Sequence, residues 1–189
     1  MQTAHFLEAS GPNAAALSTG LLVARLVFGL LMSAHGAQKL FGWFGGYGLN
    51  ATAPFFEQLG FRPGRAFAAL ASLAELVAGL LIALGLFGPV GPALMLAVMI
   101  VAAVTAHWGK GLFATTGGIE VPLLYSAVAV ALALTGPGLF SLDTVLGLET
   151  LWSPVFATVA LAAGVIGAIG NLLARRPVPS GSGAGLRTT

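Results

Sequence analysis

The chain has 189 residues, of which 57% are hydrophobic and only 7% are charged. A soluble domain carries about 25% charged residues, so 8 basic and 6 acidic side chains are too few to cover a water-soluble surface. This composition excludes a soluble enzyme, a nucleic-acid-binding protein and a disordered chain, and it indicates an integral membrane protein. The chain has no cysteine, which excludes disulfides, cysteine-ligated iron–sulfur clusters and thiol nucleophiles on it.

Five apolar blocks are long enough to cross a bilayer, which takes about 20 residues of tilted helix. They are Ser18–Gly36, Ala66–Phe87, Pro89–His107, Ile119–Gly136 and Pro154–Leu173. The blocks are continuous and lack the alternation of a membrane β-strand, so helices are favoured over a barrel. Gly88-Pro89, between the second and third blocks, predicts a tight hairpin. We therefore predict an all-α membrane protein of five spans.

The lysines and arginines outside the blocks predict the orientation of the chain. All of them fall in the first loop, the third loop or the tail: Lys39, Arg62, Arg65, Lys110, Arg175, Arg176 and Arg187. Basic loops stay in the cytoplasm, which places the amino terminus outside and the carboxyl terminus inside. The first 17 residues hold no Lys or Arg, so we expect a retained first helix rather than a cleaved signal peptide. The Pro/Ser/Gly-rich tail is predicted to be mobile.

The first loop, residues 37–65, is rich in aromatic residues, which is unusual for a hydrophilic connection. It contains Phe41, Trp43, Phe44, Tyr47, Phe55, Phe56 and Phe61. Aromatic residues beside glycines at a membrane end indicate an interfacial or partly re-entrant segment. Thr52-Ala-Pro54 and Gly60 predict the start and the end of one short helix in this loop. The loop is therefore a candidate lid.

Two charged residues, Arg25 and Glu75, lie deep within the first and second blocks. A lone charge at the middle of a bilayer costs about 3 kcal/mol on insertion scales, so the two are expected to pair. Ser72 and Gly79 flank Glu75 on its helix face, and small residues let helices approach closely. The predicted Arg25–Glu75 ion pair is either a structural clamp without a ligand or a group that touches substrate.

Polar residues also gather at the predicted inner end of the bundle. They are His35, Lys39, His107, Lys110 and Glu120. Such groups beside an apolar cavity can bind a polar head group and pass protons. The alternative is ordinary: lysines reach to the interface, Trp108 belongs to an aromatic belt, and histidines cap helix ends. His35 and His107 lack an i,i+4 spacing, so neither a haem nor a metal site is expected.

The fifth block carries small residues at Gly164, Gly167 and Gly170. A face of small residues allows close packing of a helix from the same chain or from a partner protein. Packing within the chain is the simpler interpretation.

The polar positions and their spacing resemble the DoxX family of small membrane proteins. The matching stretches are residues 22–29, 35–40, Leu59-Gly60, 75–79, Gly85-Leu86, 118–120, 136–138 and 141–143. The resemblance implies a four-helix membrane bundle, with Arg25, His35, Lys39, Glu75 and Glu120 at the characteristic polar positions. It also implies a role beside redox enzymes, since some relatives are subunits of quinone-reducing thiosulfate oxidoreductases, associate with terminal oxidases or are linked to redox-defence complexes.

We divide the chain into a short extracytoplasmic segment (1–17), a DoxX-like four-helix domain (18–143), an extra transmembrane region (144–173) and a flexible basic tail (174–189). The last two regions lie outside the usual four-helix pattern of the family. The expected location is the bacterial cytoplasmic membrane, where the chain contacts lipid and other membrane subunits.

The function that we expect is that of a small subunit of a respiratory or redox complex, contributing to the binding of a quinone. In this hypothesis His35 and Glu120 handle protons, while Lys39, His107 and Trp108 bind the carrier. Electrons come from a partner, because the chain carries no recognisable redox centre. The alternative is a non-catalytic assembly or anchoring subunit. A transporter ranks last, because the expected inverted repeat or pair of broken helices is missing.

Overall fold

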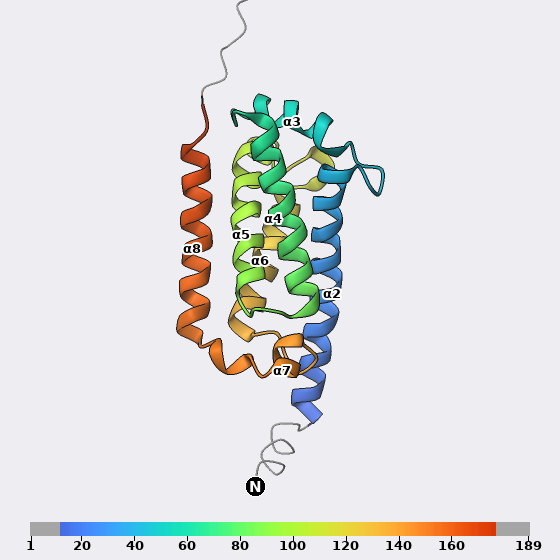
Figure 1. The fold of residues 1–189 in the computed structure, drawn as a ribbon, viewed down its shortest axis with the longest axis vertical. Helices are drawn as coiled ribbons and strands as arrows, with labels where there is room; N and C mark the ends of the chain where they lie inside the picture. The colour runs from blue at the N-terminus through green and yellow to red at the C-terminus, as the bar shows by residue number, and fades with distance from the viewer. Residues whose placement is uncertain (1–11, 177–189) are drawn as a thin grey trace, which may run out of the picture.

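The computed structural model describes residues 12–176, and the regular structure in this range is helical throughout (Figure 1). The α-helices are α2 (Pro12–Phe41), α3 (Gly48–Gln58), α4 (Gly64–Leu84), α5 (Val90–Ala102), α6 (Glu120–Thr135), α7 (Leu142–Leu146) and α8 (Pro154–Leu173). A π-helical turn, η1 (Ala103–His107), continues α5, and two short 3-10 turns are η2 (Ala114–Thr116) and η3 (Glu149–Leu151). Most of the predicted amino-terminal segment and of the tail lies outside the described residues.

The protein is an all-α membrane protein, as predicted. Within residues 12–176, four helices are long and apolar enough to cross a membrane: α2, α4, α8 and α5 continued by η1. α6 is a largely apolar helix of 16 residues that lies in the same bundle, although it is shorter than the other four. α2 packs on α4, α4 on α5, α5 on α6 and α6 on α2, and α8 stands outside this ring against α5 and α6.

Small residues bring α2 and α4 into direct backbone contact. A Cβ atom added at Gly29 would lie 2.7 Å from the backbone of Gly79, and one at Gly36 would lie 2.6 Å from the backbone of Ser72. Such contacts fix how the two antiparallel helices are aligned along their length. In this alignment Lys39 lies level with Glu75.

Arg25 and Glu75 do not pair, so the predicted ion pair is wrong. The Arg25 guanidinium lies instead beside Gly85, at the far end of α4 from the lysine. It donates hydrogen bonds to the carbonyl oxygens of Pro137 and Phe140. The prediction failed because it took each residue's depth in the membrane from its position within its apolar block. The glycine contacts align α2 and α4 differently, so that Arg25 and Glu75 lie at different depths.

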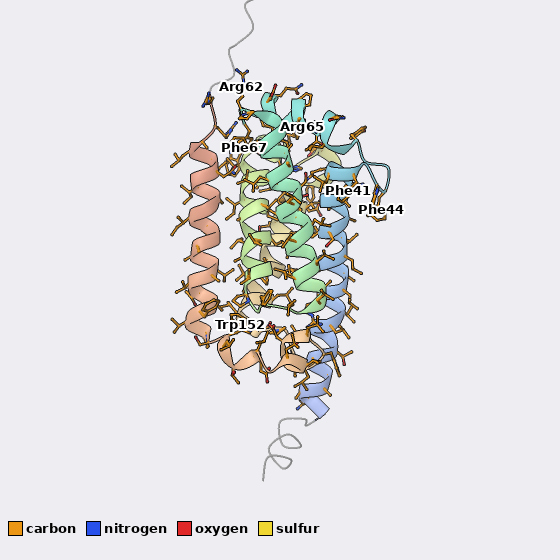
Figure 2. All side chains as sticks on the ribbon, viewed as in Figure 1. Phe41, Phe44, Arg62, Arg65, Phe67 and Trp152 are labelled. Atoms are coloured by element: carbon orange, nitrogen blue, oxygen red, sulfur yellow. The ribbon has the colours of Figure 1, made fainter. Side chains whose placement is uncertain are left out.

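The end of the bundle that holds Arg25 is closed by a buried carboxylate. Asp143, at the start of α7, is fully buried and accepts hydrogen bonds from the backbone N–H groups of Phe87 (2.9 Å) and Gly88 (2.6 Å). These residues form the short connection between α4 and α5, which confirms the predicted hairpin. Trp152 packs over Gly88 and is seen at this end of the molecule in Figure 2.

The opposite end of the bundle is crossed by α3 (Figure 1). This helix begins at Gly48, four residues before the start predicted at Thr52, and it ends at Gln58, close to the predicted stop at Gly60. Thr52 does not cap the helix because its hydroxyl is already inside it, where it donates to the carbonyl oxygen of Gly48 at 2.8 Å. The aromatic loop thus contains an 11-residue helix that lies over the ends of the spans.

Candidate functional site

A cavity of about 660 Å³ lies beneath α3, between α4, α5 with η1, and α8. We call it the lid cleft. Its walls are mainly aromatic and aliphatic side chains, among them Phe55, Phe56, Phe61, Phe67, Val98 and Val101. Its polar lining residues are Lys39, Tyr47, Thr52, Glu75, Thr105, His107, Lys110 and Asn171. The expectation that the aromatic loop covers something is therefore supported.

The lid cleft opens on the side of the bundle. Two of its lining side chains, Phe55 on α3 and Leu70 on α4, are 48% and 58% exposed. Phe67, one turn of α4 before Leu70, lies at the α3 end of the molecule in Figure 2. Because these two exposed side chains are apolar, this part of the rim is suited to contact with the hydrocarbon region of a membrane.

An ion pair lies at the polar end of the lid cleft. The ammonium group of Lys39, at the end of α2, donates to Oε1 of Glu75 on α4. Glu75 is only 2% exposed, whereas the Lys39 side chain is 35% exposed. The other carboxylate oxygen, Glu75 Oε2, is buried and has no hydrogen-bond partner among the described residues. Buried polar atoms are nearly always paired in proteins, so this oxygen marks a place for a donor.

The π-helical turn positions His107 on the opposite wall. Its imidazole Nδ1 lies 2.7 Å from the carbonyl oxygen of Gly117. Thr105, in the same turn, donates from its hydroxyl to the carbonyl oxygen of Val101 at 2.8 Å. Single π-helical turns inside α-helices are frequent at functional sites, because they re-aim the side chains that follow.

The predicted polar residues do not all meet in the lid cleft. Lys39 and His107 line it. His35 is exposed on α2 and its ring stands edge-on to Tyr125, with ring centroids 6.4 Å apart. The Glu120 carboxylate accepts from the backbone N–H of Ala114 at 2.7 Å and so holds the loop before α6. Trp108 lines a separate hollow of about 170 Å³ between α5 and α6.

α8 forms one wall of the lid cleft through Gly167, Ala168 and Asn171. Gly164, one turn earlier, lies against the backbone of Ala93 on α5, so this part of the small-residue face packs within the chain. The sequence hypothesis did not include Asn171 or Thr105 in the site. Asn171 could have been found, because it is an amide in an otherwise apolar span.

The end of α8 is tied to the end of α3. The Arg175 side chain donates from Nε to the carbonyl oxygen of Leu59 at 2.8 Å, and its guanidinium lies 5.9 Å from the centre of the Phe61 ring. The backbone N–H of Arg176 donates to the carbonyl oxygen of Gly60 at 2.8 Å. These contacts fasten the cover of the lid cleft to its α8 wall.

Arg175→Ala should loosen α3. One side-chain hydrogen bond contributes about 1 kcal/mol, so we expect amide exchange in residues 55–61 to become about fivefold faster. Hydrogen–deuterium exchange with mass spectrometry measures this. Arg176→Ala is the matched control, because it keeps the backbone N–H that bonds to Gly60. Equal exchange in both variants and the parent would show that the Arg175 contact does not hold the lid.

Comparison with known proteins identifies the central part of the chain. Residues 20–108 match the DoxX family model, and they contain most of α2 together with α3, α4 and α5 with η1. This stretch is therefore a DoxX-family membrane domain, as the sequence motifs indicated. The comparison found no match among curated proteins or solved structures. α6 and α8 lie beyond the matched residues, so part of the lid cleft is built from outside them.

Proposed function

We propose that this DoxX-family membrane protein binds a quinone-type carrier in the lid cleft and acts as a small subunit of a membrane redox complex. The observation that carries the proposal is an apolar cleft, open to the side of the bundle, with a buried ion pair at its polar end. A quinone has the same division, with a polar ring and a long apolar tail.

The size and lining of the lid cleft fit such a molecule. Its volume of about 660 Å³ lies within the range of small-molecule sites, about 300–1,000 Å³. The aromatic and aliphatic walls suit the ring and the first part of the tail, and the exposed apolar side chains of Phe55 and Leu70 at the rim suit the rest of the tail among lipids. A bound quinone supplies two-electron, two-proton chemistry, and the electrons come from a partner subunit.

Within this proposal the residues have separate tasks. Lys39 offers N–H groups to a ring oxygen, and its pairing with Glu75 holds it at the polar end. His107 reaches the same cleft from the π-helical turn. We do not assign the proton-handling role to His35 and Glu120, because neither lines the cleft. Trp108 is likewise left out of the binding site.

The proposed orientation rests on where the basic residues lie. Six of them are at the α3 end of the described structure: Lys39, Arg62, Arg65, Lys110, Arg175 and Arg176. By the positive-inside rule, this end faces the cytoplasm of a bacterial cell and the lid cleft lies in the inner leaflet. Arg62 and Arg65 are labelled at this end in Figure 2.

Gly167→Leu should prevent quinone from binding in the lid cleft. A Cβ added at Gly167 meets nothing within 4 Å, and this residue lines the lid cleft, so the leucine side chain is free to fill it. We expect the quinone recovered by lipid extraction of the purified protein to fall about tenfold, which corresponds to a loss of 1.4 kcal/mol in binding. Gly170→Leu is the matched control, since it also has open space but lies outside the cleft.

The anchoring alternative is favoured by one observation, the exposure of α8. Only 11% of its apolar window is buried within the chain, less than in the other spans. If native purification yields a stoichiometric membrane partner and no quinone, the anchoring role is correct and the quinone proposal is wrong. If quinone is present but Gly167→Leu retains all of it, the protein binds quinone at another place.

A further inference from the structure

The polar end of the lid cleft carries an acceptor that a quinone cannot satisfy. Glu75 is buried, and its Oε1 is engaged by Lys39 while its Oε2 has no donor among the described residues. A carboxylate oxygen can only accept a hydrogen bond, and so can the carbonyl oxygen of a quinone. Two such oxygens repel each other when they meet away from water.

His107 provides a second acceptor. The Gly117 carbonyl beside its Nδ1 can only accept, so Nδ1 carries the hydrogen in this contact. In the neutral imidazole the other nitrogen, Nε2, is then a lone-pair acceptor. Two of the hydroxyl groups that line the cleft, those of Thr52 and Thr105, are already committed, because they donate to backbone carbonyl oxygens of their own helices.

The N–H groups of Lys39 do not make the polar end of the cleft a better site for a carbonyl oxygen than for a hydroxyl group. Its ammonium group has three N–H donors, and one is used on Glu75. A ligand oxygen that accepts from Lys39 therefore lies next to the Glu75 carboxylate as well. A hydroxyl oxygen accepts from the lysine and donates to the carboxylate at the same time, whereas a carbonyl oxygen does only the first.

We infer that the lid cleft binds its carrier in the reduced, hydroquinone form in preference to the quinone. This inference rests on the proposed function and adds the redox form of the ligand. The two hydroxyl groups of a hydroquinone match the two acceptors, Glu75 Oε2 and His107 Nε2. Tenfold tighter binding of the reduced form raises the midpoint potential of the bound two-electron couple by about 30 mV.

The test compares the two redox forms of one short-tailed benzoquinone. The full-length protein is purified in detergent, stripped of endogenous lipid, and titrated under argon with the hydroquinone and separately with the quinone. We expect the hydroquinone to bind at least tenfold more tightly. Glu75→Gln should bring the ratio near one, because the amide offers both a donor and an acceptor. Gly170→Leu serves as the control and should keep the parental ratio.

A second variant covers the case in which Glu75→Gln does not fold. His107→Leu removes one acceptor without touching the Lys39–Glu75 pair, and we expect it to bring the ratio of hydroquinone to quinone affinity near one. Equal or tighter binding of the quinone by the parent protein would overturn the inference and leave the proposed function intact. Failure of the parent protein to bind either form would overturn the proposed function itself.

Discussion

Lys39→Met should lower the free energy of unfolding by about 3–5 kcal/mol, the cost of leaving a buried charge without its partner. The charge concerned is the Glu75 carboxylate, which is 2% exposed and receives its only hydrogen bond among the described residues from Lys39. Methionine keeps the length and apolar stem of lysine, so the loss reports the ammonium group rather than packing. Unfolding in mixed micelles, followed by tryptophan fluorescence, measures the change.

The double variant Lys39→Met/Glu75→Met tests whether the fold needs the ion pair itself or only the absence of an unpaired charge. With both charges gone the buried site is apolar, and we expect most of the lost stability to return. Lys110→Met is the matched control, because Lys110 also lines the lid cleft but is exposed and outside any ion pair found in residues 12–176. A loss of less than about 0.5 kcal/mol in Lys39→Met would mean that the pair contributes nothing to stability.

Arg25→Met should destabilise the other end of the bundle. It removes the donors to the carbonyl oxygens of Pro137 and Phe140, which are part-buried, and a group shielded from water that is left without a hydrogen bond costs about 1–3 kcal/mol. We therefore expect a loss of about 2–6 kcal/mol in the free energy of unfolding. Amide exchange should rise in residues 136–147, which the guanidinium holds against α2.

Two substitutions distinguish the geometry of Arg25 from its charge. Arg25→Lys keeps the positive charge but lacks the planar fork that serves two carbonyl oxygens, so it should recover only part of the loss. Arg65→Met removes an exposed arginine and should change stability by less than about 0.5 kcal/mol. Full recovery by Arg25→Lys would show that only the charge matters there.

The spans of this protein could be predicted because the bilayer imposes one requirement on all of them. Apolar length sets each span, and Gly88-Pro89 marks the turn between α4 and α5. Gly60, in the left-handed region at φ +93°, marks the end of α3. These signals are local, so a single sequence contains them.

The partner of Glu75 could not be predicted in the same way. Arg25 and Glu75 share a similar place within their blocks, but Gly29 and Gly36 set the alignment of α2 against α4 and bring Lys39 to the carboxylate instead. The spacing of these two glycines, seven residues, is the signal that was missed. It places both on one face of α2, and it matches the spacing of Ser72 and Gly79 on α4.

The candidate site was predicted in part, because the sequence shows which end of a helix a residue occupies but not which side it faces. Lys39 and His107 reach the lid cleft, whereas His35 and Glu120, at the same end, turn to other neighbours. The π-helical turn at Ala103–His107 has no sequence signature. The contribution of α8 follows from its packing on α5, which its composition does not reveal.

The short length of α6 affects the surrounding lipid. Its 16 residues rise about 24 Å, against a hydrocarbon thickness of about 30 Å. Its outward face, on which Leu123, Leu124 and Leu134 are exposed, is expected to contact the lipid acyl chains. The membrane on that side must become thinner or the helix ends must recruit short-chain lipids, at a cost of a fraction of a kcal/mol per Å. We therefore expect the lipid layer around the protein to be thinner beside α6 than beside the longer spans.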